Sequence, residues 1–102
     1  MNEFQFEAQV WQWKGDGPAT WRFLTLPFDL TDEIDELTTG RQGGFGSVRV
    51  EVTIGRTTWA TSVFPSKEQR SFILPVKAAV RKAEALADGV TAHVTLRLLD
   101  SP

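Results

Sequence analysis

The sequence contains no cysteine and no tyrosine, and it has one histidine and one methionine. Without cysteine the chain forms neither disulfides nor thiolate metal sites, and one histidine cannot build a histidine-rich metal site. No apolar run approaches the ~18 residues of a membrane-spanning helix, and residues 1–6 lack a basic region followed by an apolar one. We therefore expect a cytoplasmic protein with no metal, no cofactor and no membrane partner.

The composition favours one packed domain over residues 1–102. Hydrophobic residues make up 41% of the chain, and four tryptophans and seven phenylalanines supply bulky core material. The formal net charge is only -2. This near-neutral balance argues against nucleic-acid binding over the whole surface but leaves local patches open. We expect a monomer or a weak homodimer.

Alternating apolar and polar residues dominate the chain and predict half-buried strands. About six strands are expected, at residues 4–10, 19–26, 48–54, 57–64, 70–74 and 90–98. Gly15-Asp16-Gly17-Pro18 is a strong turn signal, so the second of these strands should return antiparallel to the first. Gly55-Arg56 has the Gly-X form of a type II′ hairpin turn.

A strand–proline–helix–glycine unit occurs twice. Leu26-Pro27 recurs as Leu74-Pro75, 48 residues later, and a glycine follows each predicted helix at Gly40 and Gly89. Proline keeps the preceding residue extended and fits the first turn of a helix, whereas glycine supplies the positive φ of a helix exit. Each unit should therefore be a strand, a sharp turn, a helix and a glycine exit.

The two predicted helices differ in charge. The second has an apolar stripe at helical spacing, formed by Val76, Ala79, Val80, Ala83 and Leu86, with basic residues beside it. The first has a narrower stripe, Leu30, Ile34 and Leu37, and an acidic outer face formed by Asp29, Asp32, Glu33, Asp35 and Glu36. Asp29 or Thr31 is expected to cap the first helix. Short turns between most strands favour a mainly β fold, a single antiparallel, double-split-like β-barrel with the two short helices at its ends.

Candidate catalytic features are weak. The glycine-rich stretch 40–46 precedes a strand rather than a helix, so we interpret it as a structural loop and not a phosphate cradle. His93 should face solvent, and no serine has a nucleophile-elbow context. Carboxylates on the acidic helix lack the further oxygen ligands that a hard cation needs. The sequence therefore predicts a protein that is not an enzyme.

Two groups of residues are candidate binding sites. Trp11 and Trp13 extend the polar face of the first strand, where indoles bind flat ligands unless a helix, a loop or a partner covers them. Lys77, Arg81 and Lys82 lie off the apolar stripe of the second helix. They form either an ordinary solvated face or a site for a phosphate or carboxylate partner.

Several short motifs carry a family resemblance. They include Trp21-Arg22-Phe23, Leu26-Pro27, Gly44-Phe45-Gly46-Ser47-Val48, Thr58-Trp59 and, most specific, residues 74–83 with the sequence LPVKAAVRKA. With these motifs the chain resembles a bacterial domain-of-unknown-function family of small β-barrels, found alone or fused to bacteriocin-protection domains of the YdeI/OmpD-associated type. The resemblance implies a relative of the double-split barrels and no established activity. Asp88-Gly89 departs from the Gly-Asp order of relatives.

A more distant likeness, over residues 73–90, is to the AbrB-type regulators, in which two chains complete one double-split barrel. The twin Leu-Pro units suggest that one chain supplies both halves here. The favoured hypothesis is a binding module for a protein or small ligand near Trp11 and Trp13. The alternative is an AbrB-like nucleic-acid-binding protein that uses Lys77, Arg81 and Lys82, although the acidic helix would then repel phosphates.

Overall fold

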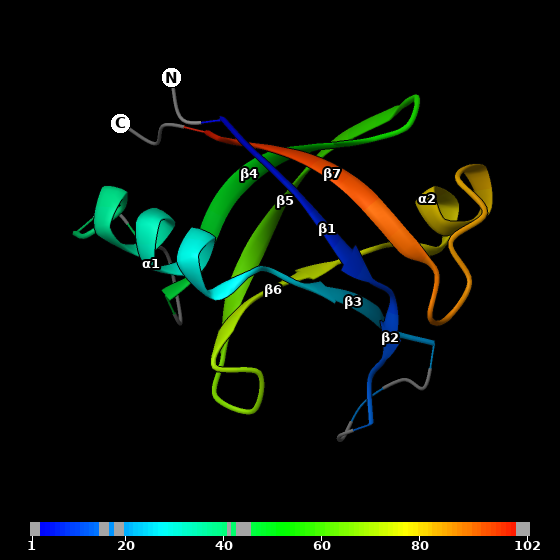
Figure 1. Ribbon diagram of the computed structural model, residues 1–102, viewed down its shortest axis with the longest axis horizontal. Helices are drawn as coiled ribbons and strands as arrows, with labels where there is room; N and C mark the ends of the chain where they lie inside the picture. Colours follow the sequence, from blue (N-terminus) through cyan, green and yellow to red (C-terminus); the bar gives the residue numbers. More distant parts are fainter. Residues whose placement is uncertain (1–2, 15–16, 18–19, 41, 43–45, 100–102) are drawn as a thin grey trace.

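The fold is a single antiparallel sheet with two short helices (Figure 1). The computed structural model describes residues 3–14, 17, 20–40, 42 and 46–99. Within these residues the elements are β1 Glu3–Gln9, β2 Trp11–Gln12, β3 Arg22–Thr25, α1 Phe28–Leu37, β4 Val48–Ile54, β5 Thr57–Ser66, β6 Ser71–Pro75, α2 Ala78–Ala83 and β7 Thr91–Leu98. The strand order is β1-β7-β4-β5-β6-β3-β2, and all neighbours are antiparallel. The predicted mainly β class is confirmed.

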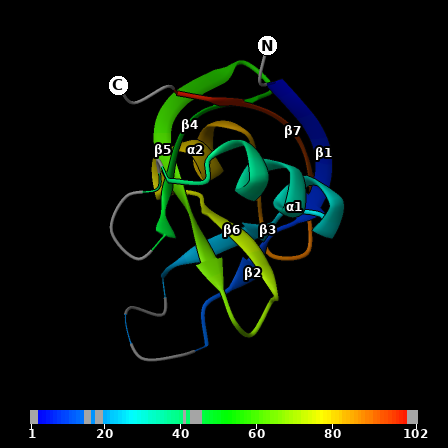
Figure 2. The same ribbon diagram turned by 90° about the vertical axis from the view of Figure 1, so that its left-hand side faces the viewer.

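The sheet curls so that its two edge strands follow each other directly in the chain. β1 and β2 stand at opposite ends of the strand order, yet only Val10 separates them. The Val10 N–H donates to the carbonyl of Val90 at 3.0 Å, and its carbonyl accepts from the Gly89 N–H at 2.8 Å. Figure 2 shows the resulting half-barrel end-on, and Figure 1 shows α1 and α2 at its opposite ends. This shape agrees with the predicted small β-barrel.

The register relates the two strand–proline–helix units by an approximate twofold axis. In the β3–β6 pair Thr25 lies opposite Ile73, the residue 48 positions later that is its counterpart in the second unit. Leu24 and Leu74 pair on one side of Thr25–Ile73, and the twofold axis relates them to Phe72 and Leu26 on the other side. These two residues are also bonded, because the Leu26 N–H donates to the Phe72 carbonyl at 3.0 Å. β1 pairs with β7 over seven residues, and β5 pairs with β4 over seven. The halves are therefore β1–β2–β3–α1–β4 and β5–β6–α2–β7.

The core lies inside the curled sheet and follows the predicted alternation. Phe4 and Phe6 of β1 and the following Val10 are buried, and alternate residues of β4 and β7 are buried in the same way. The helices contribute Ile34, Val80 and the following Leu86 to this cluster. His93 is exposed, with its Nδ1 3.2 Å from a Glu7 oxygen. Period-2 patterning therefore predicts which strand residues form the interior.

The predicted cap of α1 is wrong. The helix begins at Phe28 directly after Pro27, which occupies the N-cap position without a side-chain bond. The Asp29 carboxylate accepts only from the adjacent Leu30 N–H, at 3.0 Å. The Thr31 hydroxyl instead bonds Ser71, from β6, because helix and strand meet there. Leu37, predicted to be part of the apolar stripe, is 44% exposed.

The second helix is shorter than predicted. α2 starts three residues after Pro75, which ends β6, so this proline does not lie in the first helical turn. Ala79 and Ala83 are exposed, because one and a half turns bury only one side of the helix. Ala85 takes the left-handed conformation directly after the helix (φ +55°), and the Leu86 N–H donates to the Arg81 carbonyl at 2.9 Å. Gly40 and Gly89, the two predicted glycine exits, both have the expected positive φ of +82°.

Two further loops bear on the predictions. Gly55 has φ +59° and Arg56 has a negative φ, so the predicted type II′ turn between β4 and β5 is confirmed. β5 continues through Pro65 and Ser66, which were expected to be loop. Most of the turn 15–18 and of the glycine-rich stretch 40–46 lies outside the described residues. No helix within the described residues is long and apolar enough to cross a membrane.

Candidate binding pocket

A pocket opens where two neighbouring strands, β5 and β6, diverge. β5 pairs with β4 up to Val63 and with β6 only from Phe64 onward, whereas β6 pairs with β3 from Ile73 onward. The strands therefore diverge and leave an open pocket of about 780 Å³ between β5, α2 and the β2–β3 region. Its lining is Trp13, Thr20, Trp21, Arg22, Phe23, Trp59, Ala60, Thr61, Phe64, Pro65, Ile73, Pro75, Val76, Lys77, Ala78 and Arg81. This size is typical of small-molecule sites.

Aromatic rings form one wall of the pocket. The Trp13 ring lies 6.1 Å from the Trp21 ring and 5.5 Å from the Phe23 ring, centroid to centroid. Both contacts are tilted, the geometry that aromatic quadrupoles prefer. Phe23 is buried and Trp13 half-buried, but Trp21 is 47% exposed. The wall is thus held by its own ring contacts while part of it stays open to solvent.

Trp11 and Trp13, predicted as one patch, have different surroundings. Their rings stack with centroids 6.5 Å apart, but Trp11 does not line the pocket. The Trp11 Nε1–H donates to the Thr25 hydroxyl at 2.9 Å, and that hydroxyl donates to Gln69 Oε1 at 3.0 Å. Trp11 therefore packs against Trp13 outside the pocket. Of this predicted pair, only Trp13 lines the pocket.

Two of the three predicted cations lie at the same pocket as Trp13. Arg81 is half-buried, and its Nε and Nη2 donate to the carbonyls of Val76 and Thr20 at 3.1 and 3.2 Å. Lys77 is exposed, and its ammonium group makes no hydrogen bond or ion pair within the described residues. Lys82 does not line the pocket. The basic face predicted for α2 is therefore divided between pocket and solvent.

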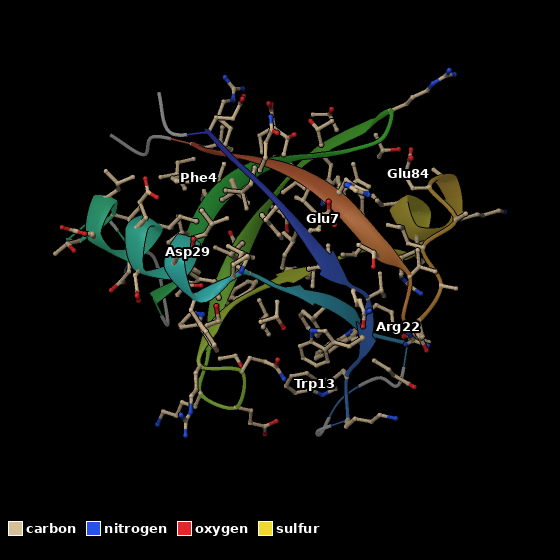
Figure 3. All side chains as sticks on the ribbon, viewed as in Figure 1. Phe4, Glu7, Trp13, Arg22, Asp29 and Glu84 are labelled. Atoms are coloured by element: carbon tan, nitrogen blue, oxygen red, sulfur yellow. The ribbon has the colours of Figure 1, made fainter. Side chains whose placement is uncertain are left out.

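Arg22 adds a third cation to the lining, which the sequence analysis did not identify as a site residue. Arg22 is labelled in Figure 3. Its Nε lies 2.5 Å from the Asp88 carboxylate, so its charge is largely neutralised. Trp59 and Phe64 were also missed, because alternation places them on opposite faces of β5. The nearest signal in the sequence is Pro65, which lacks an N–H and lies where β5 stops pairing with β4 and begins to pair with β6.

A second opening lies at the related position of the other half. It has a volume of about 690 Å³ and is lined by Glu7, Ala8, Gln9, Val10, Trp11, Gln12, Lys14, Thr25, Pro27 and Gln69. Thr25 and Pro27 occupy the positions that Ile73 and Pro75 have in the first pocket. Six of the ten residues in this second lining are polar or charged, whereas aromatic and aliphatic residues predominate in the first, so the two halves share a frame but differ in chemistry.

Clustered ligands for a metal do not occur in the part of the chain that the structure describes. There, no group of three or more histidine, cysteine, aspartate or glutamate side chains lies close enough to hold an ion. The carboxylates of α1 point outward along an exposed helix face. The pocket is thus the site whose geometry is best suited to a ligand among the described residues.

The fold and pocket place the molecule among small antiparallel β-barrel proteins. The chain belongs to the family described as Domain of unknown function (DUF1905), whose model matches residues 6–96. The predicted membership in a domain-of-unknown-function family of small barrels is confirmed. No curated protein matches the sequence. The family match spans every residue that lines the pocket.

Proposed function

We propose that this protein is a binding module, not an enzyme, and that it holds a small molecule with a flat apolar body in the pocket beside α2. The observation that carries this proposal is the aromatic wall of Trp13, Trp21 and Phe23 along an open pocket of about 780 Å³. Indole faces stack on planar rings, and such stacking contributes ~1–3 kcal/mol per ring in known complexes. A concave site favours a small ligand over a flat protein interface.

The four tryptophans provide a direct test by NMR. Each gives one indole Nε1–H signal, and three of the four, Trp13, Trp21 and Trp59, line the pocket. We expect 2-naphthylmethanol, a neutral planar probe, to shift these three signals with one common saturation curve. The Trp11 signal is the internal control, because its Nε1–H is held by Thr25. Single Trp→Phe variants assign the four signals.

A variant pair tests the same proposal by calorimetry. Trp21→Ala removes a ring that is 47% exposed, so we expect it to fold and to weaken binding of the probe at least tenfold. Phe28→Ala removes an aromatic ring that is 63% exposed on α1, away from the pocket, and should leave the affinity unchanged. Equal affinity in both variants, or a shift of Trp11 alone, would contradict the proposal.

We also propose that the protein is cytoplasmic and is a monomer or a weak homodimer. Sedimentation velocity over a hundredfold range of protein concentration tests the second statement. A sedimentation coefficient that stays at the dimer value at the lowest concentration would contradict it.

A further inference from the structure

Two of the three cations that line the pocket have no carboxylate partner among the described residues. The lining includes three cations and no aspartate or glutamate, and only Arg22 has an acidic partner, Asp88. Lys77 and Arg81 lie one helical turn apart, since the Arg81 N–H donates to the Lys77 carbonyl at 3.1 Å. Two like charges on one side of an apolar wall create a field that favours an anion.

The guanidinium of Arg81 is also fixed in place. Its two bonds to the carbonyls of Val76 and Thr20 hold the group at the pocket without cancelling its charge. A preorganised cation loses less conformational entropy when it meets a ligand. Lys77 is a flexible, exposed ammonium group that can reach the same anion.

The second half of the fold shows that this charge is specific to one opening. The counterparts of Lys77 and Arg81, 48 residues earlier, are Asp29 and Glu33. The same positions after the proline therefore carry opposite charges in the two units. Since α1 and α2 lie at opposite ends of the sheet, the acidic helix does not screen the pocket (Figure 1).

We propose that the ligand of this pocket is an aromatic carboxylate. Its ring lies along Trp13 and Trp21, and its carboxylate faces Lys77 and Arg81. The inference rests on the proposed function and adds the charge and class of the ligand. Two cations, one of them already donating to two carbonyls, match a monoanionic carboxylate better than a phosphate dianion, which offers more acceptor oxygens than they can satisfy.

Four probes with one ring system test the inference by calorimetry: 2-naphthoate, 2-naphthylmethanol, 2-naphthylmethylamine and 2-naphthyl phosphate. We expect 2-naphthoate to bind about fivefold or more tightly than the alcohol, and the amine to bind most weakly. Lys77→Gln should remove most of the difference in affinity between naphthoate and alcohol. Raising the salt concentration should weaken naphthoate binding and leave binding of the neutral alcohol unchanged.

Lys82→Gln is the matched control, because Lys82 lies on the same helix but not in the pocket. It should change neither affinity. Equal binding of naphthoate and alcohol, insensitive to Lys77→Gln, would overturn the inference and leave the proposed function standing. Tighter binding of the phosphate or the amine would overturn the carboxylate assignment. Failure of all four probes to bind would overturn both proposals.

Discussion

Glu84, at the end of α2, lies against Gly55 in the turn between β4 and β5. Its carboxylate, at the end of α2 in Figure 3, accepts two hydrogen bonds. One comes from the Thr57 hydroxyl at 2.6 Å and one from the Arg56 N–H at 3.4 Å. A Cβ atom on Gly55 would lie 2.0 Å from Glu84 Oε1. Because α2 carries Arg81, this contact also braces the helix side of the pocket.

Gly55→Ala should destabilise the protein for two reasons. The residue has φ +59°, which costs a non-glycine residue about 1–2 kcal/mol, and the new methyl group displaces Glu84. Gly40→Ala is the matched control, because Gly40 has φ +82° and no atom near its missing Cβ. Chemical denaturation should show a larger loss for Gly55→Ala, and the excess should vanish in a Glu84→Ala background. Equal losses in the wild-type background would show that the contact contributes nothing.

Two apolar residues of α1 should differ sharply in their effect on stability. Ile34 is fully buried, so Ile34→Ala should lower the free energy of unfolding by about 2–5 kcal/mol. Leu37, on the same helix, is 44% exposed, so Leu37→Ala should cost about 0.5 kcal/mol or less. Urea denaturation measures both values. Similar costs would mean that α1 does not dock through Ile34.

Ser71 should matter more than an ordinary serine. Its buried hydroxyl donates to the Leu26 carbonyl at 2.6 Å and bonds Thr31, whose oxygen accepts from the Phe72 N–H at 3.1 Å. Ser71→Ala leaves that carbonyl short of a partner and should cost ~1–3 kcal/mol. Ser62→Ala removes a half-buried hydroxyl that makes no hydrogen bond within the described residues, so it should change the thermal midpoint little. A neutral Ser71→Ala would argue that water replaces the hydroxyl.

Binding of duplex DNA through α2 should be weak. Lys77 and Arg81 face the pocket and Lys82 does not, so the three cations offer no continuous phosphate-binding stripe. We expect no saturable binding at physiological salt in a fluorescence anisotropy titration. A steep loss of affinity with rising salt, abolished by Lys77→Glu and Arg81→Glu but not by Phe28→Ala, would favour the nucleic-acid alternative.

The strands could be predicted because the alternation of apolar and polar residues is a local feature of the sequence. Alternation identified Phe4, Phe6 and Val10 as interior residues, and the repeated Leu-Pro pair predicted two matched units, which the Thr25–Ile73 pairing supports. The helix ends were not predictable in this way. The Thr31 hydroxyl was expected to cap α1, but it bonds Ser71, 40 residues away in the sequence. Such a contact depends on how distant elements dock.

The pocket was predictable only in pieces. Trp13, Lys77 and Arg81 were each candidates, but nothing local indicates that they meet, since their meeting depends on β5 and β6 diverging beyond the Phe64–Ile73 pair. Trp11 and Trp13 lie two positions apart, so strand alternation predicts the same face for both. They differ because Thr25, from the neighbouring strand, accepts the Trp11 N–H.

The twofold relation between the halves rests on backbone pairing, while much of the chemistry of each opening rests on side chains outside the core cluster, such as Trp21 and Lys77 in one and Gln9 and Lys14 in the other. Such positions of the second opening can therefore acquire rings and cations without disturbing the interior. We expect that aromatic and basic side chains introduced into the second opening would give it a binding specificity of its own at little cost in stability.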